Sequence, residues 1–414
     1  MKNLAISVLS LAIGAVGIFG QVNPVVRLDA ALDEIVPPGA TVEKVAGDLR
    51  HLEGPVWVRQ GGYLLFSDMD ANVIYQWSPG AGKVTVFLDN SGFTTQDALR
   101  LAREKAGGQE LLDIGSNGIT VDPQGRIVYC TRGDRRVMRL EQDGRRTVIA
   151  SQFEGRPLNR PNDLVYKSDG SLYFTDPTDE SGGDVFVLKD GNLRRLSQNL
   201  PHPNGLAFSP DEKYLYVVDS RESRKVHRFD VRPDGTIANG RVFFDMSSEA
   251  APNGPDGMKV DQEGNVYAPG PGGVWIISPD GRHLGSVLVP ERVANLAFGD
   301  ADGKTLYATG RTGVYRVRLK IPGIRPRQRD FERRPAGLPL LRTRTESQHS
   351  RGSAPPTPNQ QSLDNGLAEL FSHWRASVRP WRFASRGIAE SQRAYPLTAK
   401  SCKVSWFPVQ RIGY

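Results

Sequence analysis

Cysteine and histidine are scarce in this 414-residue chain, which contains two cysteines and six histidines. Cys130 lies within the repeats described below, whereas Cys402 lies near the C-terminus. A folded region that contains Cys130 as its one cysteine cannot form an internal disulfide. Its stability therefore depends on its hydrophobic core. No cluster of the two residue types suggests a structural zinc site.

Long apolar runs are lacking after the first twenty residues. The N-terminal segment MKNLAISVLSLAIGAVGIFGQ has one lysine followed by about seventeen apolar or small residues, and Gly20 offers a cleavage site. Residues 1–20 are therefore predicted to be a secretory signal peptide, with a retained membrane anchor as the alternative. We expect an exported protein, periplasmic or secreted, without a membrane span once the signal is removed.

Acidic residues are sparse at the other end of the chain. Residues 325–414 hold 16 Lys and Arg against 6 Asp and Glu, a net charge of +10, whereas the whole chain carries +7. Residues 1–324 thus carry about −3, so the basic isoelectric point is no argument for nucleic-acid binding. Residues 325–414 also lack sustained periodicity, which predicts a basic, disordered tail. A contact of this tail with acidic partners or membranes is the alternative.

One short phrase recurs between the two ends. It appears as EGPVW, NGITV, NDLVY, NGLAF, DGMKV and ANLAF, beginning at Glu53, Asn117, Asn162, Asn204, Asp256 and Ala294. The successive spacings are 64, 45, 42, 52 and 38 residues. Most phrases are followed by a turn such as DPQG and by further β-rich runs, giving four short strands per repeat. Such repeats are typical of propeller blades, so residues 21–324 are predicted to form an all-β, six-bladed β-propeller.

Two further segments fit this architecture. The long first spacing contains TQDALRLAREKAGG, which predicts a helix in an insertion that forms either a flap over one face or a surface excursion. The run TVEKVAGD, Thr41 to Asp48, is expected to supply the outer strand of the last blade. The fold is then expected to end near Ile324.

The first residues of the six phrases are expected around one mouth of the central channel. Five of the six carry a side-chain oxygen and none is basic. Asn-Gly and Asp-Gly are common turn dipeptides, which accounts for three of them individually but poorly for Glu53. A ring of oxygen donors with two carboxylates suits a divalent cation such as Ca²⁺, Mg²⁺ or Mn²⁺. Glu53 is therefore predicted to be a metal ligand.

The stretches HLEGPVW, RPLNRPNDLVY, PNGLAFSPDE and PDGMKVDQEGNVY resemble the gluconolactonase, regucalcin (senescence marker protein) and LRE-like family, and especially its exported bacterial gluconolactonases. The resemblance covers roughly residues 40–322. It implies a propeller with one catalytic divalent cation that hydrolyses sugar lactones. The resemblance implies metal ligands at Glu53, Asn204 and Asp256, with Asn162 at or near the ion. It also implies that Asp256 is the catalytic acid and base. Substrate contacts are implied at Arg160, Asn162 and Asn117.

Some residues depart from the family pattern or leave alternatives open. Arg132, in TRGDRR, stands where the family pattern leads us to expect His-Gly, which leaves the substrate open. An interblade salt bridge is the alternative role for Arg160. His51 and His202 each lie two residues before a phrase and are rival candidates for the base. Asp176, Asp179 and Glu180 are expected in a solvated turn, with a place at the channel entrance as the alternative.

Three functions are compatible with these observations. The first is a metal-dependent lactonase that uses Ca²⁺ above all, with Mg²⁺, Mn²⁺ or Zn²⁺ possible, and acts on a small sugar lactone such as gluconolactone. The second is a phosphotriester hydrolase on the same site. The third is a non-catalytic ligand-binding propeller with a structural cation. No nucleic-acid partner is expected, and the sequence leaves the oligomeric state open.

Overall fold

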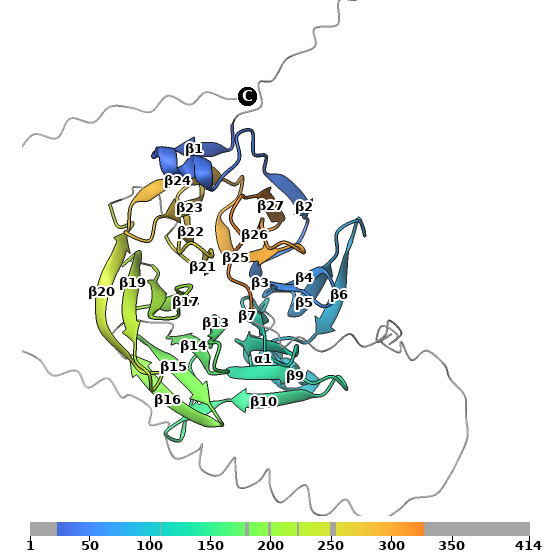
Figure 1. The fold of residues 1–414 in the computed structure, drawn as a ribbon. Coiled ribbons are helices and arrows are strands. Elements are labelled where there is room, and N and C mark those ends of the chain that lie inside the picture. The colour runs from blue at the N-terminus through green and yellow to red at the C-terminus, as the bar shows by residue number, and fades with distance from the viewer. Residues whose placement is uncertain are drawn as a thin grey trace, which may run out of the picture. The chain divides into compact units, whose positions relative to one another are not determined.

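The computed structural model describes residues 23–326, apart from 108, 179–181, 198–199, 222 and 249–253. These residues form six antiparallel sheets of four or five strands arranged around a central axis (Figure 1). The prediction of an all-β, six-bladed propeller is therefore confirmed. The predicted signal peptide, residues 1–20, and the tail after Pro326 lie outside the described residues.

The first three blades each contain four strands that follow one another in the chain. Blade 1 comprises β3 (Leu52–Val58), β4 (Tyr63–Asp68), β5 (Val73–Trp77) and β6 (Val84–Asp89). Blade 2 comprises β7 (Ser116–Val121), β8 (Ile127–Thr131), β9 (Arg136–Leu140) and β10 (Arg146–Ala150), and the hairpin β11 (Gln152–Phe153) and β12 (Arg156–Pro157) follows it. Blade 3 comprises β13 (Leu164–Tyr166), β14 (Leu172–Pro177), β15 (Gly183–Lys189) and β16 (Asn192–Ser197).

The last three blades include strands from the N-terminal segment. Blade 4 comprises β17 (Pro203–Phe208), β18 (Tyr214–Asp219), β19 (Lys225–Val231) and β20 (Ile237–Asp245). Blade 5 comprises β21 (Lys259–Val260), β22 (Val266–Gly270), β23 (Gly273–Ile277) and β24 (His283–Leu288), and β1 (Val25–Arg27) joins its edge at β24. Blade 6 comprises β25 (Val293–Gly299), β26 (Thr305–Gly310), β27 (Val314–Arg318) and β2 (Glu43–Ala46).

The N-terminal segment closes the ring. Strand β2 pairs with β27, which confirms the prediction made for Thr41 to Asp48. The pairing of β1 with β24 was not predicted from the sequence. The 3-10 helix Ala30–Glu34 connects the two strands. The segment before blade 1 therefore adds one edge strand to each of the last two blades.

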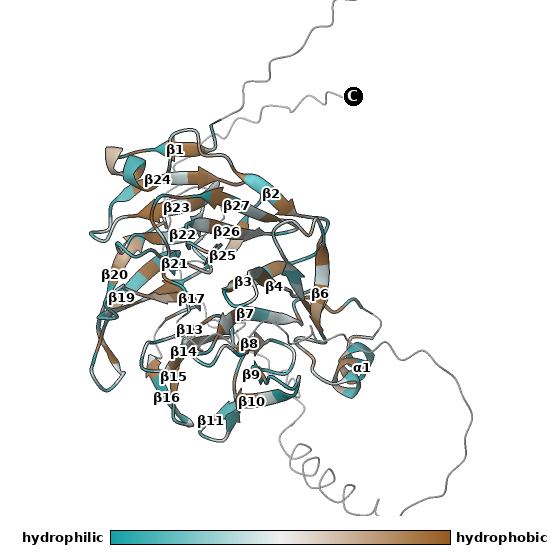
Figure 2. Ribbon diagram, turned by 45° about the vertical axis from the view of Figure 1, so that its right-hand side comes forward, coloured by the Kyte–Doolittle hydropathy of each residue, from teal (hydrophilic) through white to brown (hydrophobic). Residues whose placement is uncertain are grey.

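Apolar side chains between neighbouring blades form the core. Most inner and middle strands are buried on both faces, as β4 and β18 show. The apolar colour in Figure 2 follows these strands. Trp57 of blade 1 stacks on Tyr307 of blade 6 with ring centroids 5.5 Å apart. Blades 1 and 6 are thus joined by aromatic packing as well as by the chain, which runs from β2 in blade 6 to β3 in blade 1.

The insertion between blades 1 and 2 contains the predicted helix, α1 (Gln96–Lys105), whose N-cap is Thr95. Thr95 Oγ1 accepts a hydrogen bond from the Ala98 amide at 3.2 Å, as an N-cap does. Both ends of the insertion form hydrogen bonds with the turn between β8 and β9. The Thr94 amide donates to the Asp134 carboxylate, and the Gly133 amide donates to the Ile114 carbonyl. Within the described residues, no helix is long and apolar enough to cross a membrane.

Candidate active site

Four of the six phrase-starting residues are the second residue of an innermost strand, whereas Asn162 and Asp256 lie two and three residues before theirs. These strands, β3, β7, β13, β17, β21 and β25, surround the centre of the ring in Figure 1. All six residues are buried: Glu53, Asn117, Asn162, Asn204, Asp256 and Ala294. The repeat thus places one side chain per blade at one end of the channel.

Glycine after the phrase-starting residue lets the innermost strands approach one another. Gly54 has φ +44°, and a Cβ there would lie 2.0 Å from the Asn117 carbonyl oxygen. A Cβ on Gly205 would lie 2.4 Å from the Asp256 carbonyl oxygen. Close backbone approach of this kind needs glycine. It brings Glu53 beside Asn117, and Asn204 beside Asp256.

An aspartate at the end of the second strand fixes the loop before the innermost strand in three blades. Asp176 accepts the amides of Asn159 and Arg160, each at 2.8 Å. Asp68 and Asp219 accept the amides of His51 and His202 in the equivalent places. Burial raises the pKa of Asp176 to about 6. Asp176 is therefore a buried positioning residue rather than part of a solvated turn, while Asp179 and Glu180 lie outside the described residues.

A polar layer that the sequence did not reveal lies beside Glu53. Asn295 donates its side-chain amide to Glu53 Oε2 at 3.3 Å and to Asp163 Oδ2 at 3.2 Å. Asn295 Oδ1 accepts from Lys259 Nζ at 3.2 Å and from the Leu296 amide at 2.8 Å. Because two donors fix the amide oxygen, the amide nitrogen faces the two carboxylates.

The carboxylates of the channel are crowded and buried. Burial raises the pKa of Glu53, and the carboxylates of Asp256 and Asp163 raise it further. Burial also raises the pKa of Asp256, while Arg292, whose Nη2 lies 3.3 Å from Asp256 Oδ2, opposes the shift. Bringing these carboxylates together in the ionised state requires positive charge at the site.

Two buried oxygens of the ring lack hydrogen-bond partners among the described residues, namely Asp256 Oδ1 and Asn117 Oδ1. Unpartnered buried acceptors are costly unless a ligand completes them. No group of three or more His, Cys, Asp or Glu side chains in the described part of the chain is arranged as a metal site. A cation here would therefore draw on amide oxygens as well as on Glu53 and Asp256. That donor set fits Ca²⁺ better than Zn²⁺.

Arg160 reaches the mouth of the channel from the loop before β13. Its Nη2 lies 2.9 Å from Asp113 Oδ2, and Asp113 belongs to the insertion. Arg160 thus forms an ion pair with a residue outside the blades, and its predicted substrate contact stays a prediction. His51 Nδ1 lies 3.5 Å from Asp70 Oδ1, and burial lowers the pKa of His51.

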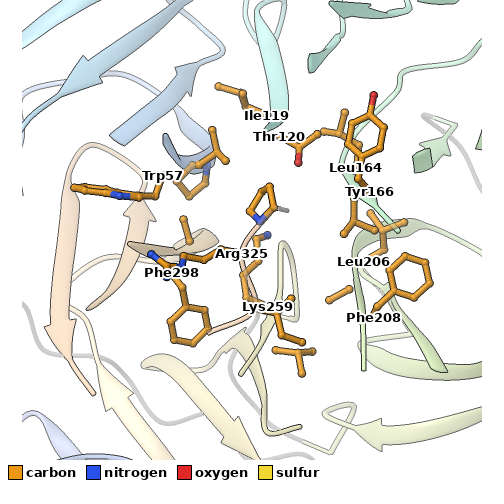
Figure 3. Close-up of a pocket in the computed structure, with 18 of the residues that line it drawn as sticks. Trp57, Ile119, Thr120, Leu164, Tyr166, Leu206, Phe208, Lys259, Phe298 and Arg325 are labelled. Carbon is orange, nitrogen blue, oxygen red and sulfur yellow. The ribbon is translucent and has the colours of Figure 1, made fainter. Parts of the chain in front are cut away.

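A second, apolar pocket lies where the same inner strands end (Figure 3). Its walls include Trp57, Ile119, Leu164, Leu206, Phe208 and Phe298. Lys259 and Arg325 also line it. Arg325 donates to the Asp300 carbonyl at 2.8 Å, although the sequence assigned it to the tail. None of the six phrase-starting residues lines this pocket.

The family comparison identifies the kind of propeller. Residues 52–312 match the family described as the SMP-30/Gluconolactonase/LRE-like region. The chain belongs to this family. The match extends from β3 in blade 1 to the turn before β27 in blade 6, and it confirms the resemblance inferred from the repeats.

Several relatives of the chain are lactonases. The gluconolactonase of Zymomonas mobilis is 37% identical over 318 residues, which cover 72% of this chain and 85% of the relative. Pentonolactonase XacC of Haloferax volcanii is 28% identical over 270 residues, covering 63% of this chain and 81% of the relative. A solved gluconolactonase from Xanthomonas campestris has a TM-score of 0.61 and 30% identity, covering 72% of this chain and 95% of that one. The family and these relatives show that the chain is a lactonase.

Proposed function

We propose that this lactonase opens sugar lactones with the help of one divalent cation bound by the oxygen ring of the channel. The observation that carries the proposal is that Asp256 Oδ1 and Asn117 Oδ1 are buried without a hydrogen-bond partner in the described part of the chain, in a ring that also contains Glu53. Glu53, Asn204 and Asp256 would hold the cation, with Asn162 at or near it. When bound, the cation would polarise the lactone carbonyl and lower the pKa of a water molecule.

Side chains of this protein carry out proton transfer and substrate binding. Asp256 accepts the proton of the attacking water, whose oxygen bonds to the carbonyl carbon, and then returns a proton to the ring oxygen as the ester C–O bond breaks. Arg292 lies beside Asp256 and favours its ionised form. Arg160, Asn162 and Asn117 would bond the sugar hydroxyls and the carboxyl group that forms.

Calcium is the cation that this donor set favours, because every proposed ligand atom is a carboxylate or amide oxygen. Mg²⁺ and Mn²⁺ also take oxygen ligands but with smaller, more regular shells, and Zn²⁺ prefers nitrogen and sulfur. The relatives favour lactone hydrolysis over phosphotriester hydrolysis and over a non-catalytic role.

Chelation tests the proposal. The purified protein is stripped with EDTA and assayed with five- and six-membered aldonolactones, before and after addition of each cation. We expect the lactonase rate to fall on chelation and to return most fully with Ca²⁺. Full activity after complete removal of divalent cations, verified by elemental analysis, would disprove cation dependence without disproving lactonase activity.

A further inference from the structure

The insertion before blade 2 supplies a carboxylate to two arginines at the channel mouth. Asp113 Oδ2 lies 2.7 Å from Arg132 Nη2 and 2.9 Å from Arg160 Nη2. The Asp113 amide donates to Asp70 Oδ1 at 2.8 Å, which ties this residue to blade 1. A single carboxylate from the insertion thereby fixes guanidinium groups of blade 2 and of the loop before blade 3.

This cluster faces the oxygen ring. Arg132 begins the turn that follows β8, and its charge acts on the carboxylates of both Glu53 and Asp256. Arg160 lies two residues before Asn162 in the chain. Arg132 is also the position at which the sequence departs from the family pattern. The cluster is thus a feature of this chain close to the proposed site.

Two atoms of the cluster are buried and have no hydrogen-bond partner among the described residues, namely Arg132 Nε and Asp113 Oδ1. The Arg132 side chain is only 11% exposed. In a two-bonded arginine–carboxylate pair, both carboxylate oxygens would be used. Here Asp113 Oδ2 accepts hydrogen bonds from both Arg132 and Arg160, whereas Asp113 Oδ1 accepts none from either. One donor and one acceptor of the same ion pair are therefore left unsatisfied by the residues that the structure describes.

We propose that Arg132 and Asp113 bind the hydroxyl groups of the lactone and so select neutral, polyhydroxylated lactones. A hydroxyl both donates and accepts, so one hydroxyl or two neighbouring ones satisfy Arg132 Nε and Asp113 Oδ1 together. A carboxylate or phosphate on the substrate would satisfy the arginine but would face the Asp113 carboxylate. This inference rests on the proposed function, because it assigns the sugar-binding part of the same site.

The test pairs deletion of a side chain with deletion of a substrate hydroxyl. The full-length protein, Arg132→Met and Asp113→Asn are assayed with D-glucono-1,5-lactone and with the mono-deoxy lactones that lack the hydroxyl at C2, C3, C4 or C6. Both variants should lower kcat/KM for D-glucono-1,5-lactone about 10- to 100-fold, the effect of one hydrogen bond to a charged group. For the deoxy lactone that lacks the bound hydroxyl, variants and parent should have nearly equal kcat/KM.

Controls separate binding from folding. Arg50→Met removes another arginine that pairs with the insertion, through Glu110, and it should leave kcat/KM unchanged for every lactone. Arg132→Gln replaces Arg132→Met if the latter lowers the melting temperature strongly. Equal losses by Arg132 and Asp113 variants on all the lactones would overturn the inference while leaving lactonase activity intact. Inactivity of the parent on all of them would instead overturn the proposed function, and this inference with it.

Discussion

Asn295 donates its side-chain amide to Glu53 across the join between the last and first blades, with Nδ2 3.3 Å from Oε2. The bond links residues 242 positions apart in the sequence. The Glu53 carboxylate also accepts the Gly54 amide at 3.0 Å. These two hydrogen bonds lower the cost of burying the glutamate in an inner strand. The position of Glu53 thus depends on closure of the ring.

Asp256→Asn should lower kcat by about 10²- to 10⁴-fold even when the cation is saturating. The substitution keeps an oxygen and the side-chain shape but removes the basic site that accepts the water proton. Cation titrations of parent and variant, with kcat measured at the plateau, check this. Recovery of near-parental kcat at high cation would mean that Asp256 only binds the ion and that the base must be sought at His51, at His202 or in a cation-activated water.

Glu53→Gln should weaken cation affinity while leaving much of kcat recoverable. Glutamine retains an oxygen donor but removes one negative charge from the ring, so the variant needs more cation to fill the site. Calorimetric titration gives the affinity, and the rate at saturating cation gives kcat. A kcat that stays as low as that of Asp256→Asn under saturating conditions would assign Glu53 a role in proton transfer.

Gly54→Ala should destabilise the fold much more than Gly62→Ala. Both glycines have positive φ, +44° and +64°, so both substitutions incur backbone strain of about 1 kcal/mol or more. Only at Gly54 would the new Cβ meet a backbone oxygen, that of Asn117 at 2.0 Å, whereas nothing lies within 4 Å at Gly62. Urea unfolding of both variants measures the difference. Equal losses would mean that the strands at the axis can separate without cost.

Truncation after Pro326 should leave the melting temperature and the lactonase rate unchanged. Truncation after Ile324 should cost about 1 kcal/mol, because it removes the hydrogen bond from Arg325 to the Asp300 carbonyl. Thermal unfolding of the two truncated proteins and the full chain compares them. Loss of soluble protein when only residues 327–414 are removed would show that the basic tail is needed for folding.

We propose that the protein is exported and that its mature form begins near Gln21. The proposal rests on the charged and apolar pattern of residues 1–20. Mass spectrometry of the protein isolated from separated cell fractions determines the N-terminus. An intact Met1 in the cytosolic fraction would exclude export, and an intact Met1 in the membrane fraction would indicate a retained anchor.

The sequence by itself determined the six blades, the approximate start of each innermost strand and the strand that closes the ring. These features are local, because a turn such as DPQG and the β-rich runs around it act within one repeat. At this turn Asp122 Oδ1 accepts the amides of Gln124 and Arg126, and Gly125 has φ +83°. Each blade repeats such signals, so a single chain reveals the number of blades.

Only the tertiary structure decided which side chains complete the site. In blade 6 the sequence pointed to Ala294, but the polar group that bonds Glu53 comes from the next residue, Asn295, which lies at a register shift as β25 begins. Such bulges interrupt the alternation of side chains from which a sequence argument infers direction. Asp113 could not be assigned either, since the insertion that carries it follows no repeat and reaches Arg132 and Arg160 only through the folded ring.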